Sequence, residues 1–210
     1  MTSYMTNVEG HPERSKRVEI CGGIASGKTT FADLMRIANH RAVFENFRLN
    51  PFIENFYSDP DFYSFETEIS FLLQHYSQIK TEAREPGTYF CDYSLYLDES
   101  YAQVTLTSSH LTLFQSLHST VVNEVGPPDL LVYLRCSPAT ELGRIRARQR
   151  AMEKTISLDY LNQINEALAG MLQQTAKSTQ IVEVNSDELD FAHDQQTRME
   201  MVNLITAALE

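Results

Sequence analysis

The chain has 210 residues, a formal net charge of −11 at pH 7 and a hydrophobic fraction of 42%. This length and composition suit one globular domain with a substantial core, and they exclude global disorder. The acidic excess argues against nucleic acid as a partner, because binding it requires a basic face that neutralises phosphates. Three widely spaced cysteines favour a reducing compartment over a disulfide scaffold. No apolar run approaches the roughly 20 residues of a membrane span, so we expect no membrane partner and a cytoplasmic protein.

The predicted elements alternate between strands and helices after a polar segment. Residues 1–17 lack periodicity, so we expect a flexible leader there and one domain over residues 18–210. The predicted strands are at 18–20, 42–44, 88–91, 130–134 and 181–184. Helices are predicted between and after them, at 28–40, about 62–84, 98–107, 111–125, from 138, up to about 177, and at 195–209.

Two of these helices begin with the same local signal, a capping residue followed by proline. The pairs are Asp59-Pro60 and Ser137-Pro138, and Ser157 is expected to cap the helix that follows it. The strands are short, apolar and separated by helices, which is typical of a parallel sheet buried on both faces. We therefore predict a three-layer α/β fold, with a five-stranded parallel sheet covered by helices on both faces.

The most specific motif lies between the first predicted strand and the first predicted helix. It fits the pattern G-x-x-x-x-G-K-[ST] with Gly22, Gly23, Ile24, Ala25, Ser26, Gly27, Lys28 and Thr29, and Thr30 follows. Glycines let such a loop wrap a phosphate with its N–H groups pointing inward, at the positive end of the next helix. The Lys28 ammonium can reach the β- and γ-phosphates, and the Thr29 hydroxyl can bind magnesium. This P-loop (residues 22–29) predicts binding of a nucleoside triphosphate with Mg²⁺.

Other features indicate which class of P-loop protein this is. A GTPase would carry the guanine-reading pattern N-K-x-D, which is absent from the sequence. Motor and transporter ATPases carry an apolar strand that ends in an acidic residue, whereas the strand at 130–134 is followed by Arg135 and Cys136. These differences favour a kinase of a small molecule.

A basic segment in the second half of the chain supports that class. Residues 135–150 carry only one acidic residue. They carry five arginines, namely Arg135, Arg144, Arg146, Arg148 and Arg150. On a helix, Arg144 and Arg148 would share one face, and Arg146 and Arg150 another. The alternatives are a solvated charged face or a nucleic-acid patch. Because guanidinium groups suit the spread charge of a transferring phosphoryl group, we predict an arginine-rich lid over the triphosphate.

The order and spacing of several short blocks resemble the deoxyribonucleoside kinase family from Val18 to Leu209. Besides the P-loop, the matching blocks are at residues 44–46, 56–60, 91–96, 128–130, 144–150 and 158–161. Bacterial deoxyadenosine/deoxycytidine kinases are the members that the chain resembles most. The resemblance implies a P-loop kinase domain over residues 18–210, ATP as phosphoryl donor with Mg²⁺, a deoxynucleoside acceptor, a role in nucleotide salvage and a homodimer.

The resemblance also implies roles for single residues. Glu45 falls where the family places the carboxylate that accepts the proton of the nucleoside 5′-hydroxyl, and a carboxylate at a strand end can do so. Asp92 matches the acid of an (Asp/Glu)-Arg-Ser motif near the metal. Tyr57 and Glu153 match the pair that holds the sugar 3′-hydroxyl. The expected nucleotide contacts outside the P-loop are Arg144, Arg148, Arg150, Asp190 and Phe191.

Two further acidic residues are expected to read the base. Glu68 lies where the family usually has a glutamine, and Asp98 where some members have an aspartate. Taken as ionised acceptors, these carboxylates would favour bases that carry an amino group. We therefore expect deoxyadenosine, deoxyguanosine and deoxycytidine to be preferred over thymidine. Among the histidines, only His75, seven residues after Glu68, is placed to line the pocket.

One position departs from the family pattern. Tyr93 replaces the arginine expected after Asp92, so a cation near the 5′-oxygen of the substrate is missing. This leaves two alternatives open besides the deoxynucleoside kinase. One is a nucleoside monophosphate kinase of the thymidylate type, which would need an extra cation at its acceptor phosphate. The other is a catalytically weak nucleotide-binding regulatory protein.

Overall fold

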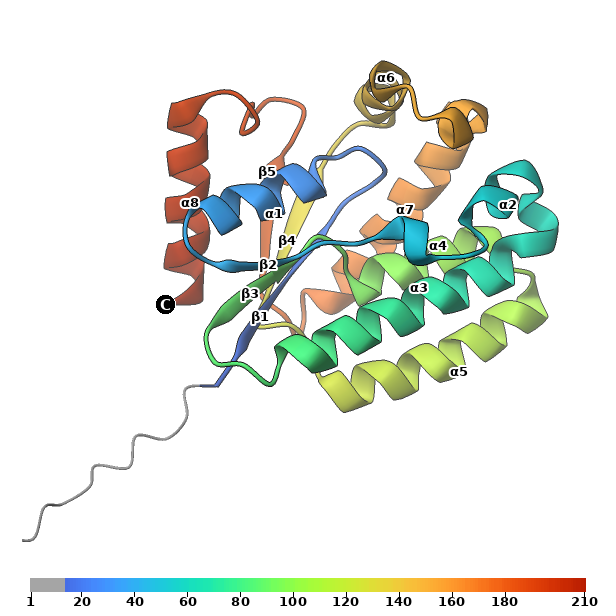
Figure 1. Ribbon diagram of the computed structural model, residues 1–210, viewed down its shortest axis with the longest axis horizontal. Helices are drawn as coiled ribbons and strands as arrows, with labels where there is room; N and C mark the ends of the chain where they lie inside the picture. The colour runs from blue at the N-terminus through green and yellow to red at the C-terminus, as the bar shows by residue number, and fades with distance from the viewer. Residues whose placement is uncertain (1–13) are drawn as a thin grey trace, which may run out of the picture.

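A five-stranded parallel sheet forms the centre of the molecule (Figure 1). The computed structural model describes residues 14–210. Residues 1–13 of the leader expected over residues 1–17 lie outside this range. The strands are β1 (Lys16–Cys21), β2 (Arg41–Val43), β3 (Thr88–Cys91), β4 (Leu130–Arg135) and β5 (Ile181–Asn185). Their order in the sheet is β2-β3-β1-β4-β5, and every neighbouring pair is parallel. The predicted fold class is confirmed.

Helices cover both faces of this sheet. They are α1 (Lys28–Ile37), α2 (Ile53–Ser58), α3 (Pro60–Glu82), α4 (Leu95–Thr105), α5 (Ser108–Val125), α6 (Pro138–Arg148), α7 (Leu158–Thr175) and α8 (Gln195–Leu209), with 3₁₀ turns η1 (Phe47–Leu49) and η2 (Ala151–Thr155). Figure 1 shows α1 and α8 on one side of the sheet and α3, α4, α5 and α7 on the other.

Alternation along the strands supplies an apolar surface to each layer. In β3, Phe90 packs with the core under α1 and α8, whereas its neighbours Tyr89 and Cys91 pack with the core under α3, α4 and α5. This is the period of two that a strand requires when both faces are buried. Because β1 lies between β3 and β4, the loop that follows it emerges at the middle of the carboxyl edge, where ligands bind in open α/β sheets.

Local signals placed several element boundaries correctly. Ser137 and Ser157 are N-caps whose hydroxyls accept from the backbone N–H of Thr140 and Tyr160, as predicted. Asp59 also occupies the N-cap position of α3, but its side chain makes no capping hydrogen bond. The helices α4 and α5 each begin three residues before the predicted start, and the short α2 and η1 were not predicted.

The segment with five arginines differs from the prediction in one respect. The helix α6 ends at Arg148, because Gln149 adopts a left-handed conformation with φ of 52°. Arg150 therefore lies in the turn that leads into η2, and the predicted pairing of Arg146 with Arg150 on one helix face is wrong. We use the name lid segment for residues 135–150.

The three cysteines are free thiols buried along the sheet. Cys21 ends β1, Cys91 ends β3, and Cys136 follows β4. No disulfide forms between them. Within residues 14–210, no helix combines the length and the apolarity that crossing a membrane requires.

Candidate active site

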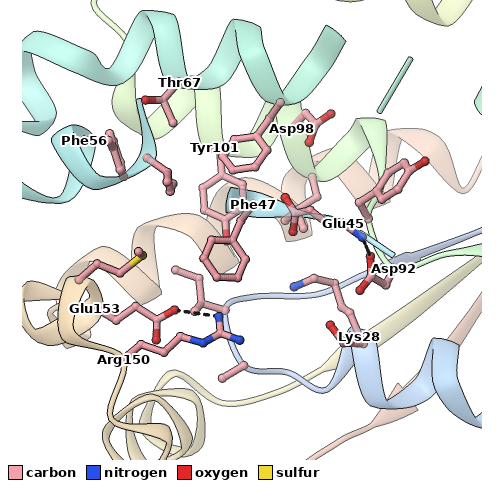
Figure 2. Close-up of a pocket in the computed structure, with 18 of the residues that line it drawn as sticks. Lys28, Glu45, Phe47, Phe56, Thr67, Asp92, Asp98, Tyr101, Arg150 and Glu153 are labelled. Carbon is pink, nitrogen blue, oxygen red and sulfur yellow. Dashed lines mark hydrogen bonds and ion pairs between the residues drawn. The ribbon is translucent and has the colours of Figure 1, made fainter. Parts of the chain in front are cut away.

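A cavity of about 510 Å³ lies at the carboxyl edge of the sheet, between the P-loop, α3, α4 and the lid segment (Figure 2). It gathers most of the residues singled out from the sequence. These are Ile24, Ala25, Gly27, Lys28, Thr29, Thr30, Glu45, Tyr57, Glu68, Asp92, Tyr93, Asp98, Arg144, Arg148, Arg150 and Glu153. Residues from eight separate segments of the chain therefore meet at one site.

Glycine is required in the P-loop at two positions. Gly22 has φ of +148°, and a Cβ there would lie 2.6 Å from the carbonyl oxygen of Leu134. Gly27 has φ of +107° at the N-cap of α1, where a Cβ would lie 2.9 Å from the ring of Phe191. These backbone conformations are accessible to glycine without the cost that a side chain would add. The loop can therefore curve tightly into the positive end of α1.

The Lys28 ammonium holds the P-loop from inside. Its Nζ donates to the carbonyl oxygens of Gly22 and Gly23, each at 2.9 Å. Burial lowers the pKa of Lys28, although the nearby carboxylates of Glu45 and Asp92 act in the opposite direction. An ammonium that lines the cavity and is held by two carbonyl oxygens is well placed to bind an incoming phosphate.

Two acidic residues at the ends of β2 and β3 face this loop. The backbone N–H of Glu45 donates to Asp92 Oδ1, which ties the two segments together. Burial alone would raise the pKa of Glu45, but the charges of His75, Lys28 and Arg150 outweigh it and hold the pKa below its usual range. Burial raises the pKa of Asp92, against hydrogen bonds from Glu45 and Thr29. The Glu45 carboxylate is thus kept ionised beside the P-loop.

A second pair of acidic residues, Glu68 on α3 and Asp98 on α4, also lines the cavity. Glu68 is buried, and burial followed by the charge of Asp98 raises its pKa to about 8. The Thr105 hydroxyl lies 2.9 Å from the carbonyl oxygen of Tyr101 and 3.2 Å from Glu68 Oε1. The Thr105 hydroxyl is the donor in both contacts, and its hydrogen bond to Glu68 lowers the pKa of that carboxyl less than burial raises it. The raised pKa favours the protonated form of Glu68 near neutral pH, and its expected contact with the base stays a prediction.

Arginines of the lid segment lie across the cavity from these helices. Arg148 makes a two-pronged ion pair with Glu153, with N···O distances of 2.7 and 2.6 Å, and Arg150 lies 3.3 Å from the same carboxylate. Figure 2 shows Glu153 and Arg150 facing each other beneath Phe47. Arg144 is engaged differently, because it donates to Ser186 O at 2.7 Å and so joins the P-loop side to the segment after β5.

Some residues chosen from the sequence lie outside the cavity. Phe191 is buried in the core, where its ring packs edge-on against Phe31 at 5.5 Å. Asp190 is exposed and accepts hydrogen bonds from His193. Three P-loop residues, Gly22, Gly23 and Ser26, support the loop from behind rather than lining the cavity.

Several lining residues were not foreseen. Phe47, Phe71, Tyr101, Met152 and Tyr160 supply apolar walls to the cavity. Tyr101 could have been found, because it follows Asp98 by three residues on one helix and therefore shares its face. Phe47 and Met152 lie in 3₁₀ turns, whose short length gives no periodic signal.

The chain matches known kinases over nearly its whole length. Residues 18–210 match the model of the deoxynucleoside kinase family. A deoxyadenosine kinase of Dictyostelium discoideum is 28% identical over 89% of this chain and 79% of that protein. A deoxyguanosine kinase of Bacillus subtilis is 27% identical over 83% and 88% of the two chains. The structure of deoxyadenosine kinase from M. mycoides, with the products dCMP and dCDP bound, has a TM-score of 0.80 at 22% identity and covers 91% of this chain and 99% of that chain.

The family model spans the P-loop, both pairs of acidic residues and the lid segment, and leaves only the first seventeen residues unmatched. The matching fold and the cavity described above agree with it. The chain belongs to the deoxynucleoside kinase family.

Proposed function

We propose that this kinase transfers the γ-phosphoryl group of ATP to the 5′-hydroxyl of a deoxynucleoside, in nucleotide salvage. The observation that carries the proposal is the meeting of Lys28, Glu45 and Asp92 beside the P-loop, in a cavity that Glu68 and Asp98 also line. The first group suits phosphates and a reacting hydroxyl, and the second suits a base. An acceptor site lined by carboxyl groups would repel a phosphate, which disfavours a monophosphate as the acceptor.

In this proposal, Glu45 accepts the proton of the 5′-hydroxyl. Its carboxylate is ionised and lies on the P-loop side of the cavity, so the hydroxyl can approach the γ-phosphate from the direction opposite to the leaving group. Lys28 neutralises the charge on the transferring group. Tyr57 and Glu153 lie near each other beside the lid segment and hold the sugar hydroxyl.

The oxygen atoms of Thr29 and Asp92 fit a magnesium ion. Thr29 in the first turn of α1 and Asp92 after β3 both line the cavity, and the Thr29 hydroxyl lowers the pKa of Asp92 against burial. Mg²⁺ is usually held by one or two protein oxygens together with phosphates and waters, and it neutralises charge on the β- and γ-phosphates.

The lid arginines contribute charge when phosphates are bound. We expect Arg148→Ala to lower kcat about tenfold or more, with a smaller change in the KM for the nucleoside, since the guanidinium is needed most in the transition state. Steady-state kinetics with ATP and deoxyadenosine measure both values. Arg146→Ala is the matched control, because Arg146 donates to the backbone of Lys154 and Ile156 outside the cavity. An unchanged kcat in a less stable Arg148→Ala protein would mean that the arginine only supports the fold.

Base preference follows from the acidic residues on α3 and α4. The Asp98 carboxylate can accept from an exocyclic amino group, and neutral Glu68 can both donate and accept, as a glutamine would. Thymine has no amino group and would leave Asp98 facing a carbonyl oxygen. We therefore propose deoxyadenosine, deoxyguanosine and deoxycytidine as the favoured acceptors.

We expect kcat/KM to be at least about tenfold higher for these three nucleosides than for thymidine, since a buried unpaired group costs about 1–3 kcal/mol. Glu68→Gln should keep this order at pH 7. Between pH 7 and 9 the wild-type Glu68 loses its proton beside Asp98, so its KM should rise, whereas the KM of Glu68→Gln should not. A coupled assay with four deoxynucleosides and their monophosphates measures these values. Thymidine or a monophosphate as the best acceptor would contradict the proposal, and identical pH dependence would remove Glu68 from it.

We further propose a cytoplasmic homodimer. The three free cysteines suit a reducing compartment. Large apolar side chains are exposed on the neighbouring helices α3 and α5, among them Phe62, Leu73 and Leu113. A second copy of the chain would cover such side chains.

A further inference from the structure

His75 lies between Asp98 and Glu45 in the cavity. It comes from the middle of α3, and its side chain is 3% exposed. The Nδ1 atom is 2.9 Å from Asp98 Oδ2, and the Nε2 atom is 3.5 Å from Glu45 Oε1. One imidazole ring therefore spans the distance between the carboxylate proposed to read the base and the carboxylate proposed to accept the proton.

The ring is held in a fixed plane. Tyr93 stacks on it with 3.9 Å between ring centroids and 5° between planes, and Phe71 lies 5.9 Å away on α3 at 29°. Contact with both aromatic rings restricts rotation of the imidazole about its Cβ–Cγ bond. Because the plane is fixed, a contact of Nδ1 with Asp98 directs Nε2 toward Glu45.

The cavity is strongly acidic around His75. The carboxyl groups of Glu45, Glu68, Asp92 and Asp98 all line it, and Tyr93 adds no positive charge. Within residues 14–210, His75 is the one basic group within ion-pair distance of Asp98. The other basic side chains of the cavity come from the P-loop and the lid segment, namely Lys28, Arg144, Arg148 and Arg150. An imidazolium is thus the local counter-charge for two carboxylates.

The Nε2 atom of His75 can donate a further hydrogen bond. At 3.5 Å from Glu45 its contact is longer than a hydrogen bond, and no other acceptor satisfies this buried nitrogen. Burial alone would lower the pKa of His75, but Asp98 and Glu45 outweigh it and raise the pKa to about 10. The charged groups that face the ring are Asp98 on α4, Glu45 after β2 and, on α3 itself, Glu68.

We propose that His75 is a positioning residue, an imidazolium that bridges Asp98 and Glu45 and aims the Glu45 carboxylate at the 5′-hydroxyl. It also supplies, from α3, positive charge beside the position where Tyr93 stands. A base that binds Asp98 holds the His75 ring in position, and the ring in turn orients the Glu45 carboxylate. Binding of the base therefore orients the group that accepts the proton. This inference rests on the proposed role of Glu45 as proton acceptor.

Two neutral variants separate the two arms of the bridge. His75→Asn places an amide nitrogen close to the position of Nδ1, so it keeps a donor for Asp98 and loses the reach to Glu45. His75→Gln places the nitrogen close to Nε2 and loses the contact with Asp98. We expect His75→Asn to lower kcat for deoxyadenosine about tenfold or more with KM within about threefold. We expect His75→Gln to raise KM about fivefold or more and to lower kcat less than His75→Asn does.

His118 supplies the matched control. It is also a buried histidine, on α5, with Nε2 2.8 Å from Leu95 O and Nδ1 3.4 Å from Glu99, but it lies outside the cavity. His118→Asn should lower the melting temperature and leave kcat and KM within about twofold of wild type. Equal kinetic losses in the His75 and His118 variants, in step with their melting temperatures, would reduce His75 to a structural role and overturn the proposal.

A second measurement does not depend on activity. In protein labelled with ¹⁵N-histidine, the two ring nitrogens of His75 should both be protonated at pH 7.5, with the signal assigned by its loss in His75→Asn. A neutral ring at that pH, or a wild-type kcat in His75→Asn, overturns the bridge. If the wild-type protein phosphorylates no deoxynucleoside, the proposed function fails instead, and the ring signal still decides whether the imidazolium forms.

Discussion

Glu45→Gln is expected to lower kcat by roughly 10²- to 10⁴-fold, the range that a positioned proton acceptor contributes. Glutamine preserves size and most hydrogen bonding but cannot take the proton of the 5′-hydroxyl. The backbone contact of residue 45 with Asp92 would remain, so the cavity should keep its shape. Because binding is largely retained, the KM for the nucleoside should change far less than kcat. Single-turnover kinetics with excess enzyme measure the chemical step directly.

Glu54→Gln is the control for this substitution, since Glu54 is exposed on α2, away from the cavity. It should leave both parameters unchanged. If Glu45→Gln keeps kcat and loses affinity, then Glu45 binds the substrate and the proton acceptor is another group, with Asp92 the next candidate.

Lys28→Ala is expected to lower kcat about 100-fold or more. The ammonium is hydrogen-bonded to the P-loop carbonyls of Gly22 and Gly23, and charge stabilisation of the transferring phosphoryl group dominates this chemistry. The carbonyl groups of Gly22 and Gly23 would lose their donor, so the KM for ATP should also rise. Initial rates at saturating ATP separate the two effects.

Lys80→Ala tests whether loss of any lysine has the same result. Lys80 is on α3, half exposed, and pairs with Glu124 at 3.2 Å. Circular dichroism would show that both variants are folded. Turnover near the wild-type level in folded Lys28→Ala would contradict the assignment of the P-loop as the phosphate site.

Much of the fold could be predicted because its signals are local. The strand at 88–91 was placed to the residue, since turn residues precede it and its apolar run ends at Asp92. Ser137 and Ser157 act as caps through their own neighbouring backbone. By contrast, α2 is only six residues long, and packing on α3 holds it in place rather than its own periodicity. The start of α4 was placed too late, although its cap, Ser94, lies in a block that was recognised.

The candidate site shows the same difference between local signals and tertiary contacts. The P-loop was recognised because a short motif carries its chemistry, whereas the role of Glu45 was predicted from the resemblance to the family. The raised pKa of Glu68 could not be predicted, because it depends on burial and on Asp98, which another helix brings close. His75 was identified only as a residue that could line the pocket, since its partners lie in the loop after β2 and on α4. Ionisation and pairing are tertiary properties, so the sequence pattern could not supply them.

Because the three thiols are buried, we expect them not to react with thiol reagents while the sheet is folded. The thiolate is the form that attacks thiol reagents, and burial raises the pKa of Cys136 to about 12 and those of Cys21 and Cys91 beyond the physiological range. Modification therefore requires the sheet to open. Cys21 directly precedes the P-loop and Cys91 directly precedes Asp92, so each thiol reports on one edge of the active site. The rate of alkylation at each cysteine would measure the opening of its own strand, with no label added to the protein.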